Sequence, residues 1–269
     1  MRLKRGITIG VFSAKGGVGK TTTVTNLGAA LAQKLKNRVL LFEANMTAST
    51  LGLHLGVLGS VSAQDVVFGR AKAEDAIVSL SYGLHVLPGS PVFSEELGVV
   101  DLRSIIDPLR ARYDVTILDS SPGSGLEVLW ALRASDMIIV VCRPEVPAIA
   151  GTLQTLRAAE NLKIPVFGVA LERVKGKRYE IPTPEIKRTL GWATIFEVPE
   201  DESIRESILR GIPLVIYKPN SPAAVAFRKL ASAVLLHMEA GRRVDARRKE
   251  PDEAVERTEH QETRPDVHA

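Results

Sequence analysis

The sequence predicts an α/β fold, a doubly wound and mostly parallel sheet with helices on both faces. Three observations predict it. Short β-branched runs alternate with helical stretches, several runs are apolar on both faces, and aromatic residues make up only 5% of the 269 residues. Strands that helices cover on both sides need a core of Val, Ile, Leu and Ala, and this composition supplies one. Right-handed crossovers between parallel strands follow.

Each predicted strand is a short run rich in β-branched residues, and each predicted helix is a longer stretch with polar interruptions. The first strand follows basic residues, but it is short and runs straight into a glycine loop, which argues against a signal peptide. Strands are predicted at 7–12, 38–43, 84–88, 114–119, 136–142, 165–171, 192–198 and 213–217. Helices are predicted at 20–36, 101–113, 149–162, 201–211 and 222–239, among others.

The composition changes near residue 240. Residues 1–239 are predicted to form one folded domain, whereas 240–269 are charged and nearly free of large apolar side chains. Such a segment cannot bury enough surface to offset its ordering entropy, so a disordered or transiently helical tail is expected.

The single cysteine excludes several classes of protein. Cys142 cannot form an intrachain disulfide, and a thiolate metal or Fe–S site needs several cysteines. It lies in the apolar run 137–143, so we expect it to be buried. No run approaches the roughly 18 apolar residues of a membrane span. A cytoplasmic protein is therefore expected.

The segment 13-SAKGGVGKT-21 lies between a predicted strand and a predicted helix. It resembles the pattern GxxxxGKT, with Ala14 in place of the first glycine. Its glycines allow successive backbone N–H groups to point inward, and the following helix directs its positive end at the same place. The segment therefore predicts a phosphate site. Lys20 would reach the β and γ phosphates, the Thr21 hydroxyl would coordinate Mg²⁺, and the remaining cradle comprises Gly16, Gly17, Val18, Gly19 and Thr22.

The longer run KGGVGKTT resembles the deviant Walker A motif of the MinD/ParA group of P-loop ATPases. The resemblance covers about residues 6 to 235 and implies the P-loop NTPase fold, with ATP and Mg²⁺ as ligands. It also implies a homodimer that sandwiches two ATP molecules, in which Lys15 reaches the partner subunit's nucleotide. A second cation would neutralise triphosphate charge that one subunit leaves facing outward. The alternative is that Lys15 is simply solvated.

In this family the strand after the first helix ends in D-x-D, and here Glu43 and Asn45 stand in those places. Glu43 keeps a carboxylate that could hold a Mg²⁺-bound water. Asn45 can orient a water but carries no charge and cannot act as a base, so we hypothesise slow hydrolysis or a long-lived ATP dimer. The alternative is that another group, such as Glu43, takes over this role.

A second switch is expected in 115-VTILDSSPGSG-125. Asp119 ends an apolar strand, as the family's Walker B carboxylate does, and would bind Mg²⁺ through water. The resemblance implies that the Gly123 N–H senses the γ phosphate. An Asp at a strand end is otherwise a common turn former.

The resemblance places the base pocket late in the chain. Glu172 and Arg173 stand where the family has an Asn-Arg pair. A glutamate can accept a hydrogen bond from the adenine N6 amino group. It should disfavour guanine, whose O6 is itself an acceptor. The segment 197–207 matches a loop in which Pro199 packs near the base. Without the resemblance, both segments read as ordinary strand-to-helix loops.

The second ligand of such a switch stays open. A MinD-like ATPase would position a cargo and respond to an unknown activating protein. A ParA-like ATPase would bind DNA non-specifically through surface Lys and Arg. The net positive charge and the basic segment 172–190 are compatible with DNA binding. A weakly catalytic dimerisation module is a third alternative, and a kinase-like enzyme of the same fold a fourth. Membrane attachment is poorly supported, since the tail has no aromatic or leucine-rich face.

Overall fold

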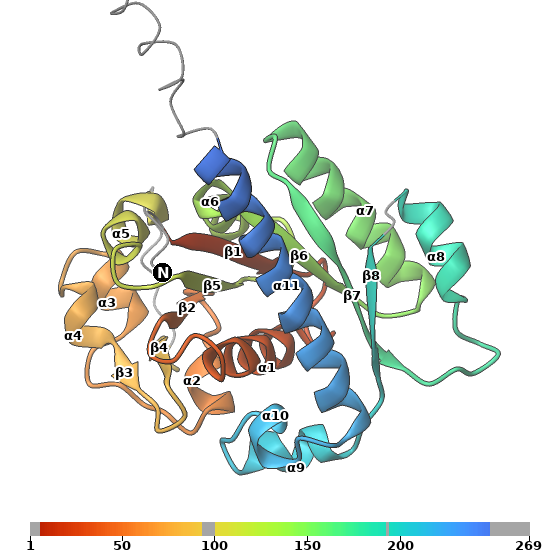
Figure 1. The fold of residues 1–269 in the computed structure, drawn as a ribbon, viewed down its shortest axis with the longest axis horizontal. Helices are drawn as coiled ribbons and strands as arrows, with labels where there is room; N and C mark the ends of the chain where they lie inside the picture. Colours follow the sequence, from red (N-terminus) through yellow and green to blue (C-terminus); the bar gives the residue numbers. More distant parts are fainter. Residues whose placement is uncertain (1–5, 93–99, 192–193, 248–269) are drawn as a thin grey trace, which may run out of the picture. The chain divides into compact units, whose positions relative to one another are not determined.

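The computed structural model describes residues 6–92, 100–191 and 194–247, with the backbone alone for 242–247. Its centre is an eight-stranded sheet in the order β3-β4-β2-β5-β1-β6-β7-β8 (Figure 1). Neighbouring strands are parallel except β3 and β4. The strands are β1 (Ile7–Phe12), β2 (Val39–Ala44), β3 (Val78–Ser79), β4 (Leu84–Leu87), β5 (Val115–Ser120), β6 (Met137–Cys142), β7 (Val166–Val174) and β8 (Ile195–Pro199).

Helices cover both faces of this sheet, which confirms the predicted fold class. They are α1 (Lys20–Ala32), α2 (Leu51–His54), α3 (Ala63–Val67), α4 (Ala73–Ala76), α5 (Leu102–Leu109), α6 (Leu126–Ala134), α7 (Val146–Asn161), α8 (Thr183–Leu190), α9 (Ser203–Leu209), α10 (Leu214–Tyr217) and α11 (Pro222–Arg247).

Successive side chains of β2 show how the two layers are divided. Leu40 and Phe42 belong to a core that α3, α5, α6, α7 and α8 share. Leu41 points to the opposite face, where it packs against Gly28 of α1. Because side chains alternate along a strand, α1 and the α6–α7 layer lie on opposite faces.

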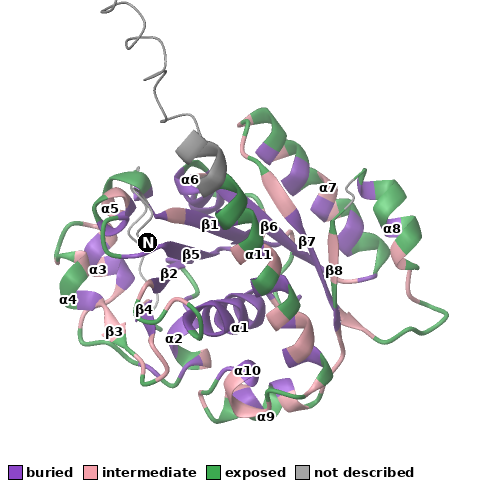
Figure 2. Cartoon of the chain, in the orientation of Figure 1, coloured by how far each residue is buried: buried purple, intermediate pink, exposed green. Residues whose placement is uncertain are grey.

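Helix α1 is buried along its whole length, as Figure 2 shows. It has no solvent-facing polar stripe because the sheet, α2 and α10 all pack against it. The Asn26 side chain satisfies one orphan group of α10 by accepting from the Val215 N–H at 3.0 Å.

One predicted strand is wrong. Residues 213–217 form Pro213 and the short helix α10, in which Leu214 and Val215 are fully buried. A short apolar run is compatible with a buried strand or a buried helical turn, and packing against α1 decided between them. Helix α11 also continues to Arg247, beyond the predicted end at 239. The rest of the predicted tail, 248–269, and part of the predicted strand 192–198 lie outside the described residues.

The chain divides into two units, 1–232 and 233–269. In the described part, no helix is both long enough and apolar enough to span a bilayer. Cys142 is 1% exposed, which confirms its predicted burial.

Candidate functional site

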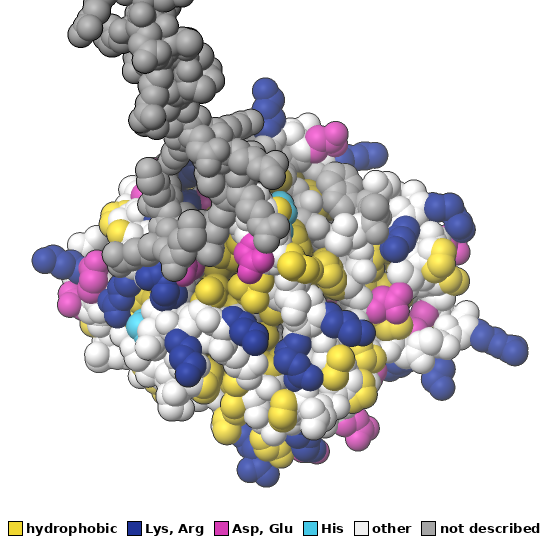
Figure 3. All heavy atoms as spheres, viewed as in Figure 1, with side chains coloured by type: hydrophobic (Ala, Val, Ile, Leu, Met, Phe, Trp, Pro, Cys, Tyr) yellow, Lys and Arg dark blue, Asp and Glu magenta, His cyan; other side chains and the backbone are white. Residues whose placement is uncertain are grey.

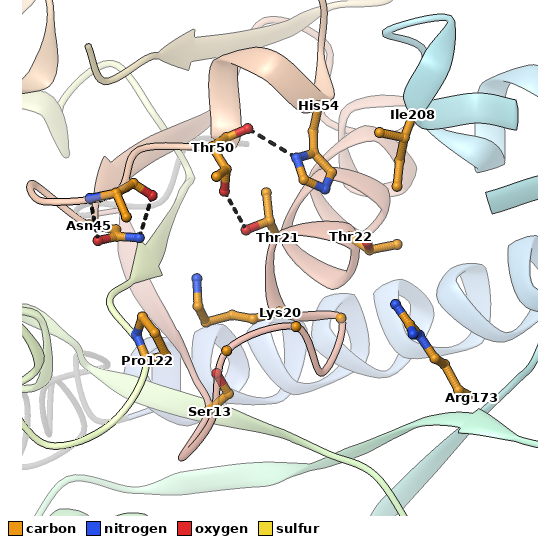
Figure 4. A pocket seen from close by; sticks show the side chains of 14 residues that line it. Ser13, Lys20, Thr21, Thr22, Asn45, Thr50, His54, Pro122, Arg173 and Ile208 are labelled. Carbon is orange, nitrogen blue, oxygen red and sulfur yellow. Dashed lines mark hydrogen bonds between the residues drawn. The ribbon is translucent and has the colours of Figure 1, made fainter. Parts of the chain in front are cut away.

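A cavity of about 350 Å³ lies at the carboxyl ends of β1, β2 and β5. It is the place where open parallel sheets bind ligands. In Figure 4, Lys20, Asn45 and Pro122 lie on one side, and Thr22, Arg173 and Ile208 on the other. The lining residues are Ser13, Gly16, Gly17, Gly19, Lys20, Thr21, Thr22, Asn45, Ala48, Thr50, His54, Pro122, Arg173 and Ile208.

The glycine loop forms one wall, and two of its glycines are required by backbone geometry. Gly17 and Gly19 have φ angles of 71° and 111°, which L side chains rarely adopt. A Cβ on Gly19 would also lie 2.9 Å from the Glu172 carboxyl carbon. α1 begins directly after the loop, so its unpaired N–H groups face the cavity, and this is an arrangement that binds phosphate.

The buried charges of the cavity form one cluster. The Lys20 ammonium is paired with Asp119, which is fully buried. The Thr21 hydroxyl donates to the other Asp119 oxygen at 2.7 Å, and the Thr50 hydroxyl lies 3.3 Å from that of Thr21. Lys20 and Thr21 of the glycine-loop motif therefore both contact Asp119, which was predicted from a separate motif.

Glu43 lies directly opposite Asp119 in the β2–β5 register and is fully buried. Its carboxyl accepts the backbone N–H groups of Asn45, Thr50 and Leu51 at 3.2, 2.9 and 2.9 Å. Burial and the nearby charge of Asp119 raise the pKa of Glu43 to about 8, although the Leu51 N–H, the Lys20 charge and the Asn45 N–H oppose the rise. Glu43 thus holds the loop before α2, and its contact with a Mg²⁺-bound water stays a prediction.

Asn45 lines the cavity, and its side chain makes hydrogen bonds within the loop that follows β2. Its amide donates to the Ala48 carbonyl at 2.7 Å and accepts the Ala48 N–H at 3.2 Å. The Ser121 hydroxyl, from the segment after β5, lies 3.0 Å from the same Asn45 oxygen. The two predicted switch segments therefore meet at Asn45.

Three predicted residues of the phosphate region lie elsewhere. Lys15 is exposed and does not line the cavity, and Val18 is buried without lining it. The Gly123 N–H donates to the Ser13 carbonyl at 3.0 Å, so here it does not face the cavity. Gly123 instead lines a smaller cavity between α6 and α7.

The predicted base-contacting residues also differ in whether they line the cavity. Arg173 lines the cavity, and its φ of 58° follows from a register shift between β7 and β8 that redirects the chain. Glu172 is 1% exposed and accepts the Thr23 hydroxyl at 2.7 Å, beneath Gly19. Pro199 ends β8 and does not line the cavity. Base contacts by Glu172 and Pro199 therefore stay predictions.

Glu172 is expected to make folding stability depend on pH. Burial raises its pKa to about 8, against the opposing effects of Thr23, Arg173 and Arg143, so the folded protein keeps a proton that the unfolded chain loses near pH 4.5. The free energy of unfolding should fall as pH rises from about 5 to 8, by at most about 1.4 kcal/mol per pH unit. In Glu172→Gln the melting temperature should fall less steeply over this pH range than in the native chain. Glu185→Gln, at an exposed site, should leave the pH dependence of the melting temperature unchanged. If melting temperature fell equally with pH in Glu172→Gln and in the native chain, Glu172 would not be the source of the pH dependence.

Several residues of the site were missed by sequence reasoning. Thr50, His54 and Ile208 line the cavity, and the His54 Nδ1 lies 3.0 Å from the Thr50 carbonyl oxygen. Arg143 donates to the Gly17 carbonyl at 3.2 Å and so supports the glycine loop. Glu127, at the start of α6, contacts both switch segments. None carries a local motif, because each reaches the site only through the fold.

The donor set fits a hard divalent cation. Thr21, Thr50 and Asp119 bring oxygen atoms together at the edge of the cavity, and Mg²⁺ prefers oxygen ligands and retains several waters. No cluster of three or more His, Cys, Asp or Glu residues suited to a metal occurs in the described ranges. Thr21 and Asp119 would therefore hold the ion with phosphate oxygens and water. A bound ion would neutralise developing charge on the phosphates.

The parallel sheet, the glycine loop at a helix N-terminus and the Lys20–Thr21–Asp119 cluster together define a P-loop nucleotide-binding protein. Comparisons with known proteins agree. An AAA domain model matches residues 6–165. An uncharacterised ATP-binding protein of Methanocaldococcus jannaschii is 34% identical over 233 residues, 85% of this chain and 88% of the relative. The septum site-determining protein MinD of Thermotoga maritima is 32% identical over 240 residues, with coverage of 85% and 88%.

Among solved structures, MinD of Pyrococcus horikoshii, complexed with Mg-ADP, superimposes with a TM-score of 0.79. It is 32% identical and the match covers 85% of this chain and 96% of that one. The chain belongs to the MinD/ParA family of P-loop ATPases. Members of this family are ATPases, and nucleotide and magnesium binding are family properties.

Proposed function

We propose that this chain is an ATP-driven switch that binds Mg-ATP, dimerises as a nucleotide sandwich and positions or partitions a cellular cargo. One observation carries the proposal. Lys15 is exposed on the glycine loop, outside a cavity whose own lysine, Lys20, is already held inside by Asp119. A triphosphate in the cavity would keep outward-facing charge that a second Lys15 could neutralise. The septum-site function named for the Thermotoga maritima relative supports a role in cell division.

Lys15→Ala is expected to abolish ATP-dependent dimerisation while leaving monomer binding of ATP within about threefold, because Lys15 does not line its own subunit's cavity. Light scattering and turnover should be measured with ATP, ADP and a non-hydrolysable analogue. The native chain should form dimers with ATP and the analogue only. Lys34→Ala removes an exposed lysine away from the cavity and is the matched control.

Two results would reject the switch. One is a native chain that stays monomeric with every nucleotide. The other is a Lys15→Ala variant that dimerises on ATP as the native chain does.

Slow hydrolysis is part of the proposal. Asn45 has no charge with which to activate a water, and its amide nitrogen already donates to the Ala48 carbonyl. Asn45→Asp should therefore raise turnover in the native background. An unchanged rate would mean that Asn45 does not limit hydrolysis.

Non-specific DNA binding is the second candidate for what the switch acts on. Figure 3 shows Lys and Arg side chains spread over one face, with fewer Asp and Glu among them. Such a surface attracts the phosphate backbone, so an ATP-dependent DNA shift that weakens with salt would support this candidate. Binding only to a protein partner, with no DNA shift, would favour the MinD-like alternative.

A further inference from the structure

Glu127, in the first turn of α6, is a buried carboxylate that no motif assigns. It is 5% exposed, and its Oε1 has no hydrogen-bond partner among the described residues. Its Oε2 accepts the Met46 N–H at 3.3 Å and contacts the Ser121 hydroxyl. A buried carboxylate is costly unless a cation or hydrogen bonds compensate its charge.

The Ser121 hydroxyl lies between two acceptors. It contacts the Glu127 carboxylate on one side and lies 3.0 Å from the Asn45 Oδ1 on the other. A serine hydroxyl carries one proton and can donate it to only one of them. The bond to a charged oxygen is roughly twice as strong as the bond to a neutral amide, so the proton turns to Glu127.

This choice decides what Asn45 can do. Its Oδ1 accepts the Ala48 N–H at 3.2 Å and, in a longer bond, the Thr47 hydroxyl at 3.4 Å. An amide oxygen has two lone pairs, so a water can replace the long bond from the exposed Thr47 hydroxyl only if the Ser121 proton does not take that place. Asn45 lines the cavity on the same side as Lys20 and Pro122 (Figure 4).

We propose that Glu127 is a positioning residue for ATP hydrolysis: it draws the Ser121 proton to itself and so leaves the Asn45 amide oxygen free to hold the attacking water. The inference rests on the proposed function. The water oxygen bonds to the γ phosphorus as the bond to the bridging oxygen of ADP breaks. The bridging oxygen keeps the electron pair, and the surplus proton leaves on the phosphate or to solvent. Glu127 accepts no proton in this step.

A double-mutant cycle tests the proposal in the full-length chain. Glu127→Gln keeps the size but loses the charge, so the Ser121 proton can turn to Asn45 and block the water site. We expect kcat to fall about 10- to 100-fold with KM for ATP nearly unchanged. In a Ser121→Ala background there is no proton to misdirect, so the same change should cost less than about twofold. Glu160→Gln, an exposed change on α7, is the matched control and should leave kcat unchanged.

A second arm guards against misfolding. Glu127→Asp keeps the charge but shortens its reach to Ser121, so it should lose kcat as Glu127→Gln does. Asn45→Asp should rescue Glu127→Gln, because a carboxylate holds water whichever way the Ser121 proton points. Melting temperature and Mg-ADP affinity should stay close to native in each variant.

Other outcomes overturn the inference. They are a Glu127→Gln rate within about twofold of native, an equal loss in the Ser121→Ala background, or a loss of kcat that follows a loss of melting temperature without rescue. In those cases the native chain still hydrolyses ATP and the proposed function stands. A native chain that neither binds nor hydrolyses ATP rejects both.

Discussion

Lys20→Ala should lower ATP turnover by about 10²- to 10³-fold, the loss typical when one donor aimed at the developing charge of a transition state is removed. Lys20 lines the cavity at the N-terminus of the fully buried α1, where we propose that the phosphates bind. ATP affinity should fall as well, by about 30-fold or more, because a charge-assisted hydrogen bond contributes roughly 2 kcal/mol or more. Single-turnover hydrolysis and calorimetric titration with Mg-ATP measure the two effects separately.

The same change should destabilise the nucleotide-free protein. Lys20 and Asp119 form a buried pair, so removing the lysine leaves a fully buried carboxylate without its cation. Breaking such a pair from one side costs about 3 kcal/mol or more. The double variant Lys20→Ala with Asp119→Asn should recover most of this stability but none of the turnover. Equal stability of the single variant and the native chain would show that the pair contributes little.

Asp119→Asn should separate magnesium-dependent binding from nucleotide binding. In the free protein the Asp119 carboxylate competes with phosphate for the Lys20 ammonium, and it also accepts the Thr21 hydroxyl. Removing its charge frees both groups for phosphate. We therefore expect ADP affinity in EDTA to stay equal or increase, whereas turnover with Mg²⁺ falls by at least about 100-fold because the ion loses its carboxylate.

Titrations with ADP in EDTA and in excess Mg²⁺, for the native chain and for Asp119→Asn, measure this separation. Asp75→Asn changes an exposed carboxylate on α4 and is a suitable control. A variant that loses affinity equally with and without Mg²⁺ would mean that Asp119 acts through the fold of the cavity rather than through the ion.

Sequence reasoning recovered the parts of the site that carry a recognisable local pattern in the chain. The glycine loop, Lys20 and Thr21 lie within one motif, and Asp119 ends a recognisable apolar strand. Their neighbours along the chain dictate their conformation, because a strand, a turn with positive φ and a helix N-terminus are local features. The structure places all three in contact as the motif implies.

Residues that act through distant contacts were not recovered. Glu127, Thr50 and Arg143 carry no pattern of their own, and each reaches the cavity or its loops across the carboxyl edge of the sheet. The roles inferred by analogy for Glu172 and Gly123 also depend on direction. In this structure Glu172 turns to Thr23 and the Gly123 N–H to Ser13.

Short apolar segments divide in the same way. Residues 7–12 were recognisable as a strand because a glycine loop follows them directly, whereas 213–217 had no such marker and became α10 on the surface of α1. The local order of polar and apolar residues was thus sufficient to predict the layered sheet and the glycine loop, since the conformation of each depends mainly on neighbours in the chain. Packing settled which groups the buried carboxylates contact, since those groups come together from separate strands.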